Sequence, residues 1–227
     1  MVFYRAHDGV TVNLYTSAQA KLSVRNDVLL AIRQETDYPN SGKVQLKLDP
    51  ARPVKFPLQL RIPAWARGAS VTINGRPAAG TVKSGTFFAV NREWKAGDTV
   101  MLDLPMSWRL VKGRQRQAGR VAVMRGPQVF CLNPAQNPAL AKLDGIELGY
   151  LALDPASLGE PVKNGVVRPG GLGCRVQAWK PGFGLGKEGD FALTLTEFPD
   201  PDGKATYFRL RDFSAAVDDE LFTAKTE

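Results

Sequence analysis

The sequence has 227 residues, 44% of them hydrophobic, which is enough to bury one large core or two smaller ones. Its 22 glycines and 16 prolines argue against a helical bundle, because both residues interrupt helices. The formal net charge is +8, and no apolar run is long enough to span a membrane.

The first part of the chain predicts strands from its hydrophobic pattern. Residues 10–15, 44–49 and 58–62 alternate apolar and polar side chains, as half-buried strands do. Residues 28–32 form a continuous apolar run, which is typical of a strand covered on both faces. Pro63 ends the third alternating segment, because proline has no backbone donor for the ladder.

A hairpin is predicted next. The strand-like residues 71–73 run into Asn-Gly at 74–75, a pair that accepts the positive φ angles of a type I′ turn. Residues 87–90 and 99–104 are further short strands. Short strands at this spacing favour an antiparallel sandwich.

Residues 113–119 are polar and basic, which is typical of a junction between domains. After them, strand-like segments recur at residues 121–124, 129–132, 191–196 and 206–210. The sequence therefore predicts an all-β chain of two consecutive antiparallel β-sandwich domains, residues 1–112 and 113–227.

The positive charge lies in the first half of the chain. Residues 1–112 hold 16 Lys and Arg against 8 Asp and Glu, whereas residues 113–227 hold 14 of each. The local basic cluster is Lys112, Arg114, Arg116 and Arg120, without interleaved aromatic residues. This favours a solvated linker or an interface with an acidic neighbouring domain over nucleic-acid binding.

Patterns that could carry catalysis or bind cofactors are weak. His7 is the only histidine, and no serine lies in a G-x-S-x-G elbow. Residues 184–189 fit G-x-G-x-x-G, but a strand is predicted after them where a dinucleotide site needs a helix. The calcium-like start at 200–203 has Arg211 at the twelfth position, where a glutamate is required, so a β-turn is expected.

Carboxylate pairs of the kind that glycosidases use are also poorly placed. Glu35 with Asp37, and Glu188 with Asp190, are two residues apart, so on a strand each pair shares one face and cannot flank a sugar. We predict no catalytic residue and no metal site in this chain. Among the four tryptophans, Trp179 is the best candidate for an exposed sugar-stacking ring, although a packed aromatic is the favoured interpretation.

Cys131 and Cys174 lie in apolar contexts, which favours buried free thiols. A disulfide between them is left open by the sequence. The N-terminus lacks the charged-then-apolar layout of a signal peptide, so we expect a soluble protein whose compartment is not determined.

Several ordered motifs together resemble a known family. They are Val12 to Tyr15, Gln34 to Pro39, Leu60 to Ala66, Val71 to Gly75, Arg92 to Asp98, Asp103 to Met106 and Arg125 to Leu132. Their order and spacing are similar to the C-terminal β-domains of the β-L-arabinofuranosidases of glycoside hydrolase family 127 (GH127). The resemblance covers most of residues 10–132 and is weaker afterwards.

The resemblance implies where the chemistry lies. In that family a zinc-bound cysteine, with further cysteine and glutamate ligands, acts within a preceding helical barrel. Cys131 and Cys174 do not match those motifs, so no catalytic residue is carried over. Tyr38, in the loop similar to the family's, is a second candidate for substrate binding. Asn40 stands where the family usually has tryptophan, which puts one barrel contact in doubt.

These observations predict a non-catalytic accessory region that supports a helical-barrel catalytic domain, provided in cis or by a separate chain. Zinc would belong to that barrel, and the substrate would be an arabinose-containing glycan. We expect the isolated chain to be inactive. The alternative is a free-standing carbohydrate-binding module.

Overall fold

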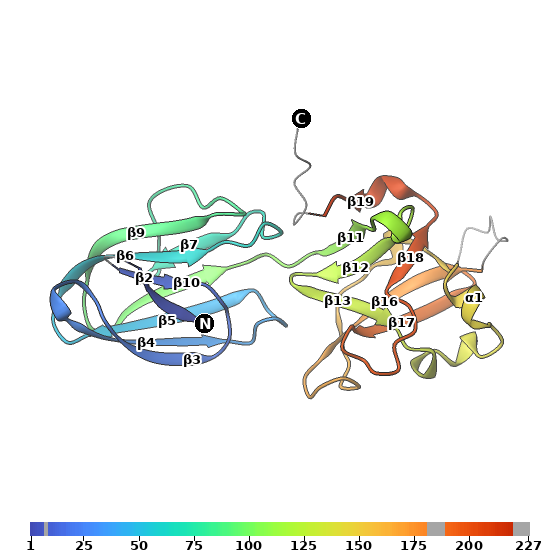
Figure 1. The fold of residues 1–227 in the computed structure, drawn as a ribbon, viewed down its shortest axis with the longest axis horizontal. Helices are drawn as coiled ribbons and strands as arrows, with labels where there is room; N and C mark the ends of the chain where they lie inside the picture. Colours follow the sequence, from blue (N-terminus) through green and yellow to red (C-terminus); the bar gives the residue numbers. More distant parts are fainter. Residues whose placement is uncertain (7–8, 181–188, 220–227) are drawn as a thin grey trace. The chain divides into compact units, whose positions relative to one another are not determined.

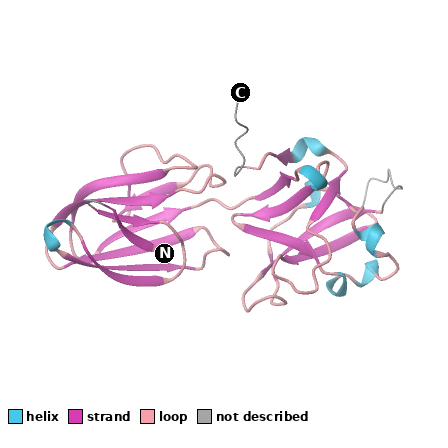
Figure 2. Ribbon diagram, viewed as in Figure 1, coloured by secondary structure: helices cyan, strands magenta, loops and turns pink. Residues whose placement is uncertain are grey.

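The structure is a computed structural model that describes residues 1–6, 9–180 and 189–219. Most regular elements are strands (Figures 1 and 2), so the predicted all-β class is confirmed. The chain divides into two compact units, Met1–Met106 and Ser107–Glu227. In the described residues, no helix is long and apolar enough to cross a bilayer.

The first unit has two sheets within its described residues. The smaller sheet has the order β1 (Phe3–Ala6), β2 (Gly9–Val12), β6 (Val54–Arg61) and β9 (Phe87–Trp94). The larger has the order β3 (Ala18–Ser23), β4 (Leu29–Thr36), β5 (Lys43–Pro50), β10 (Asp98–Asp103), β7 (Ser70–Ile73) and β8 (Arg76–Pro77). The pairing of β2 with β6 is parallel, unlike the other pairings given for this unit.

The predicted hairpin is confirmed. Ile73 of β7 pairs with Arg76 of β8, and the two residues between them, Asn74 and Gly75, have φ angles of 50° and 78°. Asn and Gly are the residues that accept these left-handed angles in a two-residue turn.

The side chains of both sheets form one core. Every second residue of β5 is buried, and Val44, Leu46 and Leu48 are inaccessible to solvent. From the smaller sheet, Leu58 and Leu60 of β6 join the same cluster. The alternation in the sequence therefore reflects strands with one face on this core.

Trp94, at the end of β9, is the largest fully buried side chain of the core. Its indole Nε1 donates a 3.0 Å hydrogen bond to the backbone carbonyl of Phe56, and the two rings lie 6.0 Å apart. The guanidinium of Arg92 lies 5.2 Å from the centre of the indole ring. Burial of this polar ring is thus satisfied by a hydrogen bond within the sheet.

The second unit contains one main sheet in its described residues. Its order is β13 (Gln128–Leu132), β17 (Phe191–Glu197), β16 (Leu172–Trp179), β14 (Ala152–Leu153), β18 (Tyr207–Leu210), β12 (Val121–Arg125), β11 (Trp108–Lys112) and β19 (Ala216–Val217). The two-residue strand β15 (Val162–Lys163) pairs with β16. In the described part of this unit the α-helix is α1 (Gly145–Leu148), and short 3-10 helices lie at Gln115–Gln117, Pro134–Gln136, Pro138–Leu140, Pro155–Ser157 and Phe213–Ala215. A further 3-10 helix, Arg25–Asp27, lies in the first unit.

This sheet closes on itself. The first two residues of β12 pair with β18, while Val123 to Arg125 pair with β13. Since β13 starts the sheet order, the pairing of β12 with β13 completes a ring of six strands: β13, β17, β16, β14, β18 and β12. The described part of this unit is therefore a small closed barrel. The second β-sandwich that the sequence predicted is not confirmed by its hydrogen bonding.

The boundary between the units differs from the one expected from the sequence. Strand β11 pairs along its whole length with β12, from Trp108 opposite Arg125 to Lys112 opposite Val121. Residues 107–112 thus belong with the second unit, whereas the sequence placed them at the end of the first domain. The change of unit falls between Met106 and Ser107, before the polar stretch that was expected to be the junction.

A buried carboxylate fastens the segment that enters β18. Asp200 accepts hydrogen bonds from Thr196 Oγ1 at 2.7 Å, Asn133 Nδ2 at 2.8 Å and the Asp202 backbone nitrogen at 3.0 Å. Burial works to raise the pKa of the Asp200 carboxyl, but these hydrogen bonds outweigh it and hold the pKa below its usual range. The predicted β-turn at 200–203 is confirmed, because Gly203 N donates to Asp200 O.

Replacing Trp94 with phenylalanine should lower the free energy of unfolding by about 1–3 kcal/mol, because the Phe56 carbonyl loses its donor inside the core. Urea unfolding of the full chain, followed by circular dichroism, measures the effect. Phe87→Leu, at a half-exposed site on the same strand, is the control and should change stability little. An unchanged midpoint for Trp94→Phe would show that the hydrogen bond contributes nothing.

Asp200→Asn should destabilise the protein by about 1–3 kcal/mol at pH 7. The native pKa of Asp200 is lowered, so its stabilisation is present above the unfolded pKa of about 3.9 and is lost as the pH falls. The difference from wild type should therefore shrink in unfolding experiments below about pH 4. The control is Asp202→Asn, at an exposed site. A difference that stays constant down to pH 3 would contradict the ionised role of Asp200.

Candidate functional site

Tyr38 lies in the loop between β4 and β5, at one end of the first unit. Its ring meets the Tyr15 ring edge-on, with centroids 5.8 Å apart. The Tyr15 hydroxyl donates to the backbone carbonyl of Arg61, and Arg61 Nε donates to the Asn13 carbonyl at 2.6 Å. Tyr38 is thus part of a packed cluster that ties the loop to the ends of β2 and β6.

The electrostatics of this cluster keep both phenols protonated. Burial raises the pKa of Tyr15 and of Tyr38, and the nearby positive charge of Arg61 only partly opposes this. A phenol of this kind can donate a hydrogen bond, but it is a poor base or nucleophile near neutral pH. Asn40 follows the cis Tyr38-Pro39 bond, and its backbone nitrogen donates to Asp37 O at 2.8 Å.

Trp179 ends strand β16 in the second unit and is only 5% exposed. The guanidinium of Arg211 lies 4.8 Å from the centre of its ring. The ring is therefore packed, as the favoured interpretation of the sequence had it. Trp179 and Tyr38 lie in different units, and their roles in substrate binding stay predictions.

Cys131 and Cys174 are free and buried. Burial raises the pKa of the Cys174 thiol to about 12, and it also raises that of Cys131, whose Sγ lies 3.6 Å from Thr196 Oγ1. Because the thiolate is the nucleophile and metal ligand, both side chains are held in an inert form. No group of three or more metal-ligating side chains occurs among the described residues.

The buried acid Glu197 is occupied by structural contacts. Its carboxylate accepts hydrogen bonds from Arg168 Nε at 2.7 Å and Nη2 at 2.6 Å, from Gln128 Nε2 at 2.7 Å, and from Leu172 N at 2.9 Å. This bidentate ion pair fastens the segment before β16 to β17. His7, Glu188 and residues 184–188 of the glycine motif lie outside the described residues.

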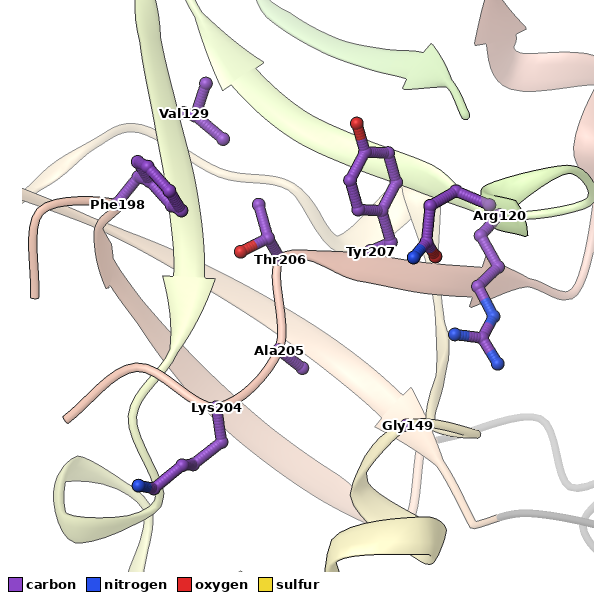
Figure 3. A pocket seen from close by; sticks show the side chains of 9 residues that line it. Arg120, Val129, Gly149, Phe198, Lys204, Ala205, Thr206 and Tyr207 are labelled. Carbon is purple, nitrogen blue, oxygen red and sulfur yellow. The ribbon is translucent and has the colours of Figure 1, made fainter. Parts of the chain in front are cut away.

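The second unit has a cavity of about 470 Å³ on the outside of its barrel, which no sequence pattern predicted. The cavity lies where the partner of β12 changes from β18 to β13. Figure 3 shows Phe198 and Tyr207 on either side of Thr206, with Arg120 beyond Tyr207. The residues that line it are Gln117, Arg120, Val129, Gly149, Phe198, Lys204, Ala205, Thr206 and Tyr207.

Backbone hydrogen bonds hold the walls of this cavity. The Phe198 nitrogen donates to Val129 O at 2.8 Å, and Leu132 N donates to Ala205 O at 2.7 Å. Tyr207 begins β18 and pairs with Ala122 of β12. The lining comes from five separate stretches of sequence, so no local motif could reveal it. Arg120 of the basic cluster is the lining residue that the sequence had singled out.

Comparisons with known proteins agree with the resemblance seen in the sequence. The family model of the GH127 middle domain of β-L-arabinofuranosidases matches residues 9–106. A curated relative, the non-reducing end β-L-arabinofuranosidase of Bifidobacterium longum subsp. longum, is 38% identical over 118 residues. The match covers 48% of this chain and 18% of the relative, so the chain spans a small part of that enzyme's length.

Solved structures share the fold over nearly the whole chain. A GH127 β-L-arabinofuranosidase from Geobacillus stearothermophilus T6 superposes with a TM-score of 0.75 at 24% identity, over 92% of this chain and 35% of that one. A GH127 β-arabinofuranosidase with 26% identity has the same TM-score and covers 96% of this chain and 37% of its own. Residues 9–106 are therefore similar to the GH127 middle domain, and the chain as a whole shares its fold with part of these GH127 structures.

Proposed function

We propose that this chain is a non-catalytic accessory region of a GH127-like glycoside hydrolase and supports a helical-barrel catalytic domain, in cis or on a separate chain. The observation that carries the proposal is the asymmetry of the structural matches. They include 92–96% of this chain but only 35–37% of the enzymes. The matched enzymes therefore have most of their length outside the region they share with this chain.

The buried groups of the second unit support a structural role. The carboxylate oxygens of Glu197 and Asp200 accept internal hydrogen bonds, and burial keeps the two cysteines as thiols. Cys131 and Cys174 do not fit the zinc site that the family resemblance places in the barrel, because zinc requires accessible thiolates. No catalytic step is assigned to any residue of this chain.

One end of the first unit supports a docking role. Leu14 is 43% exposed and Phe87 is 46% exposed. Phe87 pairs with Arg61, and Arg61 in turn binds the Asn13 carbonyl next to Leu14. Both apolar side chains therefore lie at the same end of the unit as the Tyr38 loop. We propose this end as the face that packs against the helical barrel.

The purified chain alone should release no arabinose from a β-L-arabinofuranoside, since nothing in it is proposed to act on the glycosidic bond. The measurement is chromatographic detection of free arabinose after prolonged incubation. The full-length Bifidobacterium longum relative is the positive control. Steady release of arabinose by the chain, proportional to its concentration, would overturn the non-catalytic assignment.

The chain should bind the isolated helical-barrel domain of a GH127 relative, and Leu14→Asp or Phe87→Asp should weaken this binding by at least about tenfold, because each places a charge in an apolar interface. Analytical ultracentrifugation of the mixture gives the affinity. Leu29→Asp is the matched control: Leu29 is 50% exposed but begins β4 at the opposite end from the Tyr38 loop. Equal loss for all three variants, or no binding by wild type, would contradict the proposed face.

A further inference from the structure

The two sheets of the first unit carry different side chains on their outer faces. In both sheets, residues that join the core alternate with residues that point away from it. On the larger sheet, the outward positions of β3, β4 and β5 are rich in charge: Lys21, Arg33, Glu35, Lys43, Lys47 and Asp49. Charged side chains at this density are typical of a sheet face that stays in water.

The outer face of the smaller sheet has no such charge in its middle. The outward residues there are uncharged: Tyr4, Thr11, Pro57, Gln59, Ala89 and Asn91. Among the described outward positions of β2, β6 and β9, charge is confined to the two ends, with Arg61 at one and Lys55 opposite Glu93 at the other. Depletion of charge at the centre and charge at the rim is the pattern of a protein interface.

The polar groups in the middle of this face are partly satisfied within the sheet. Thr11 is only 1% exposed, and its Oγ1 donates a 3.0 Å hydrogen bond to Gln59 Oε1. Gly9 adds no side chain beside it, since a Cβ there would lie 2.0 Å from the Pro57 carbonyl oxygen. The face is therefore low, and a partner can cover it without stripping water from a charged group.

This face continues directly from the end that carries Leu14 and Phe87. Phe87, Ala89 and Asn91 are alternate residues of β9, so all three side chains point to the same side of the sheet. At a rise of about 3.3 Å per residue, the row reaches roughly 13 Å from Phe87 toward the opposite end of the unit. Phe87 thus belongs both to the proposed docking end and to the outer face of the smaller sheet.

The area that a stable interface needs requires such a continuation. A specific interface buries about 800 Å² on each partner, whereas a fully buried aromatic side chain contributes about 150–250 Å². Leu14 and Phe87 are already more than half covered within the chain, so they can supply only a small part of that area. An interface that contains them must extend over adjoining surface, and the uncharged face is the surface onto which Phe87 leads.

From these observations we infer that the outer face of β2, β6 and β9 is a docking surface for the helical barrel, continuous with the end that carries Leu14 and Phe87. The inference rests on the proposed function for the identity of the partner. A helical face with few charges lies over Gln59, Ala89 and Asn91, and the charged residues at the two ends form the rim. The outer face of the larger sheet stays in water.

Charge-introducing variants test this surface. Ala89→Arg and Asn91→Arg should each weaken binding of the chain to the helical-barrel domain of a GH127 relative by at least about fivefold, because each places a charge in an uncharged interface. Gln45→Arg is the matched control, since Gln45 is an exposed, uncharged, outward residue of β5 in the larger sheet, and it should bind like wild type. Analytical ultracentrifugation gives the affinities, and circular dichroism confirms that each variant is folded.

Hydroxyl-radical footprinting of the wild-type chain probes the same surface without any substitution. Tyr4 and Phe87 should lose most of their labelling when the barrel domain binds. Met101, which is 37% exposed on the outer face of the larger sheet, should keep its labelling.

The outcomes separate this inference from the proposed function. Wild-type affinity of both arginine variants, unchanged labelling of Tyr4, or an equal loss of affinity in Gln45→Arg would overturn the docking role of the sheet face. If Leu14→Asp and Phe87→Asp still weaken binding in that case, the proposed function stands with a smaller interface. A wild-type chain that does not bind the barrel domain would overturn both.

Discussion

The second unit depends on one strand that changes partner halfway. β12 pairs with β18 through Val121 and Ala122 and with β13 through its remaining residues. This double pairing closes the ring of strands, so the edge of the sheet that an open sandwich would expose is used internally. It also forces the chain that enters β18 to cross the outside of β13, where Leu132 and Ala205 form an isolated bridge. The cavity and the Asp200 cluster both lie along this crossing.

The sequence predicted the features that local chemistry determines. The Asn74-Gly75 turn, the alternating strand from Val44 to Leu48 and the all-β class are found as expected. Closure of the barrel could not be predicted in the same way. β14 has only two residues, too few for any periodicity, yet it connects β16 to β18. A sheet closed by such short pairings depends on contacts between residues far apart in the chain.

The same contrast applies to the candidate sites. A packed ring was the favoured interpretation for Trp179, and the structure shows the ring buried, with the Arg211 guanidinium over it. Phe198 lies next to the buried Glu197 and has no motif of its own, yet it is more than half exposed. Burial at the end of a strand depends on which segment crosses above it, and that is a tertiary property. The basic cluster contains one residue of the cavity lining, Arg120, but only the structure shows that it lies near residues as distant in the sequence as Tyr207.

The buried carboxylates Glu197 and Asp200 are committed to structural hydrogen bonds, and we propose that the function of the chain lies on its surfaces. The proposal that the catalytic barrel belongs to the same assembly is tested most directly by sequencing the genomic DNA on both sides of the coding segment. We expect a helical barrel with its own cysteine and glutamate cluster, either in frame with this chain or on a neighbouring gene. Stop codons in frame and no barrel nearby would contradict the claim and leave a free-standing β protein.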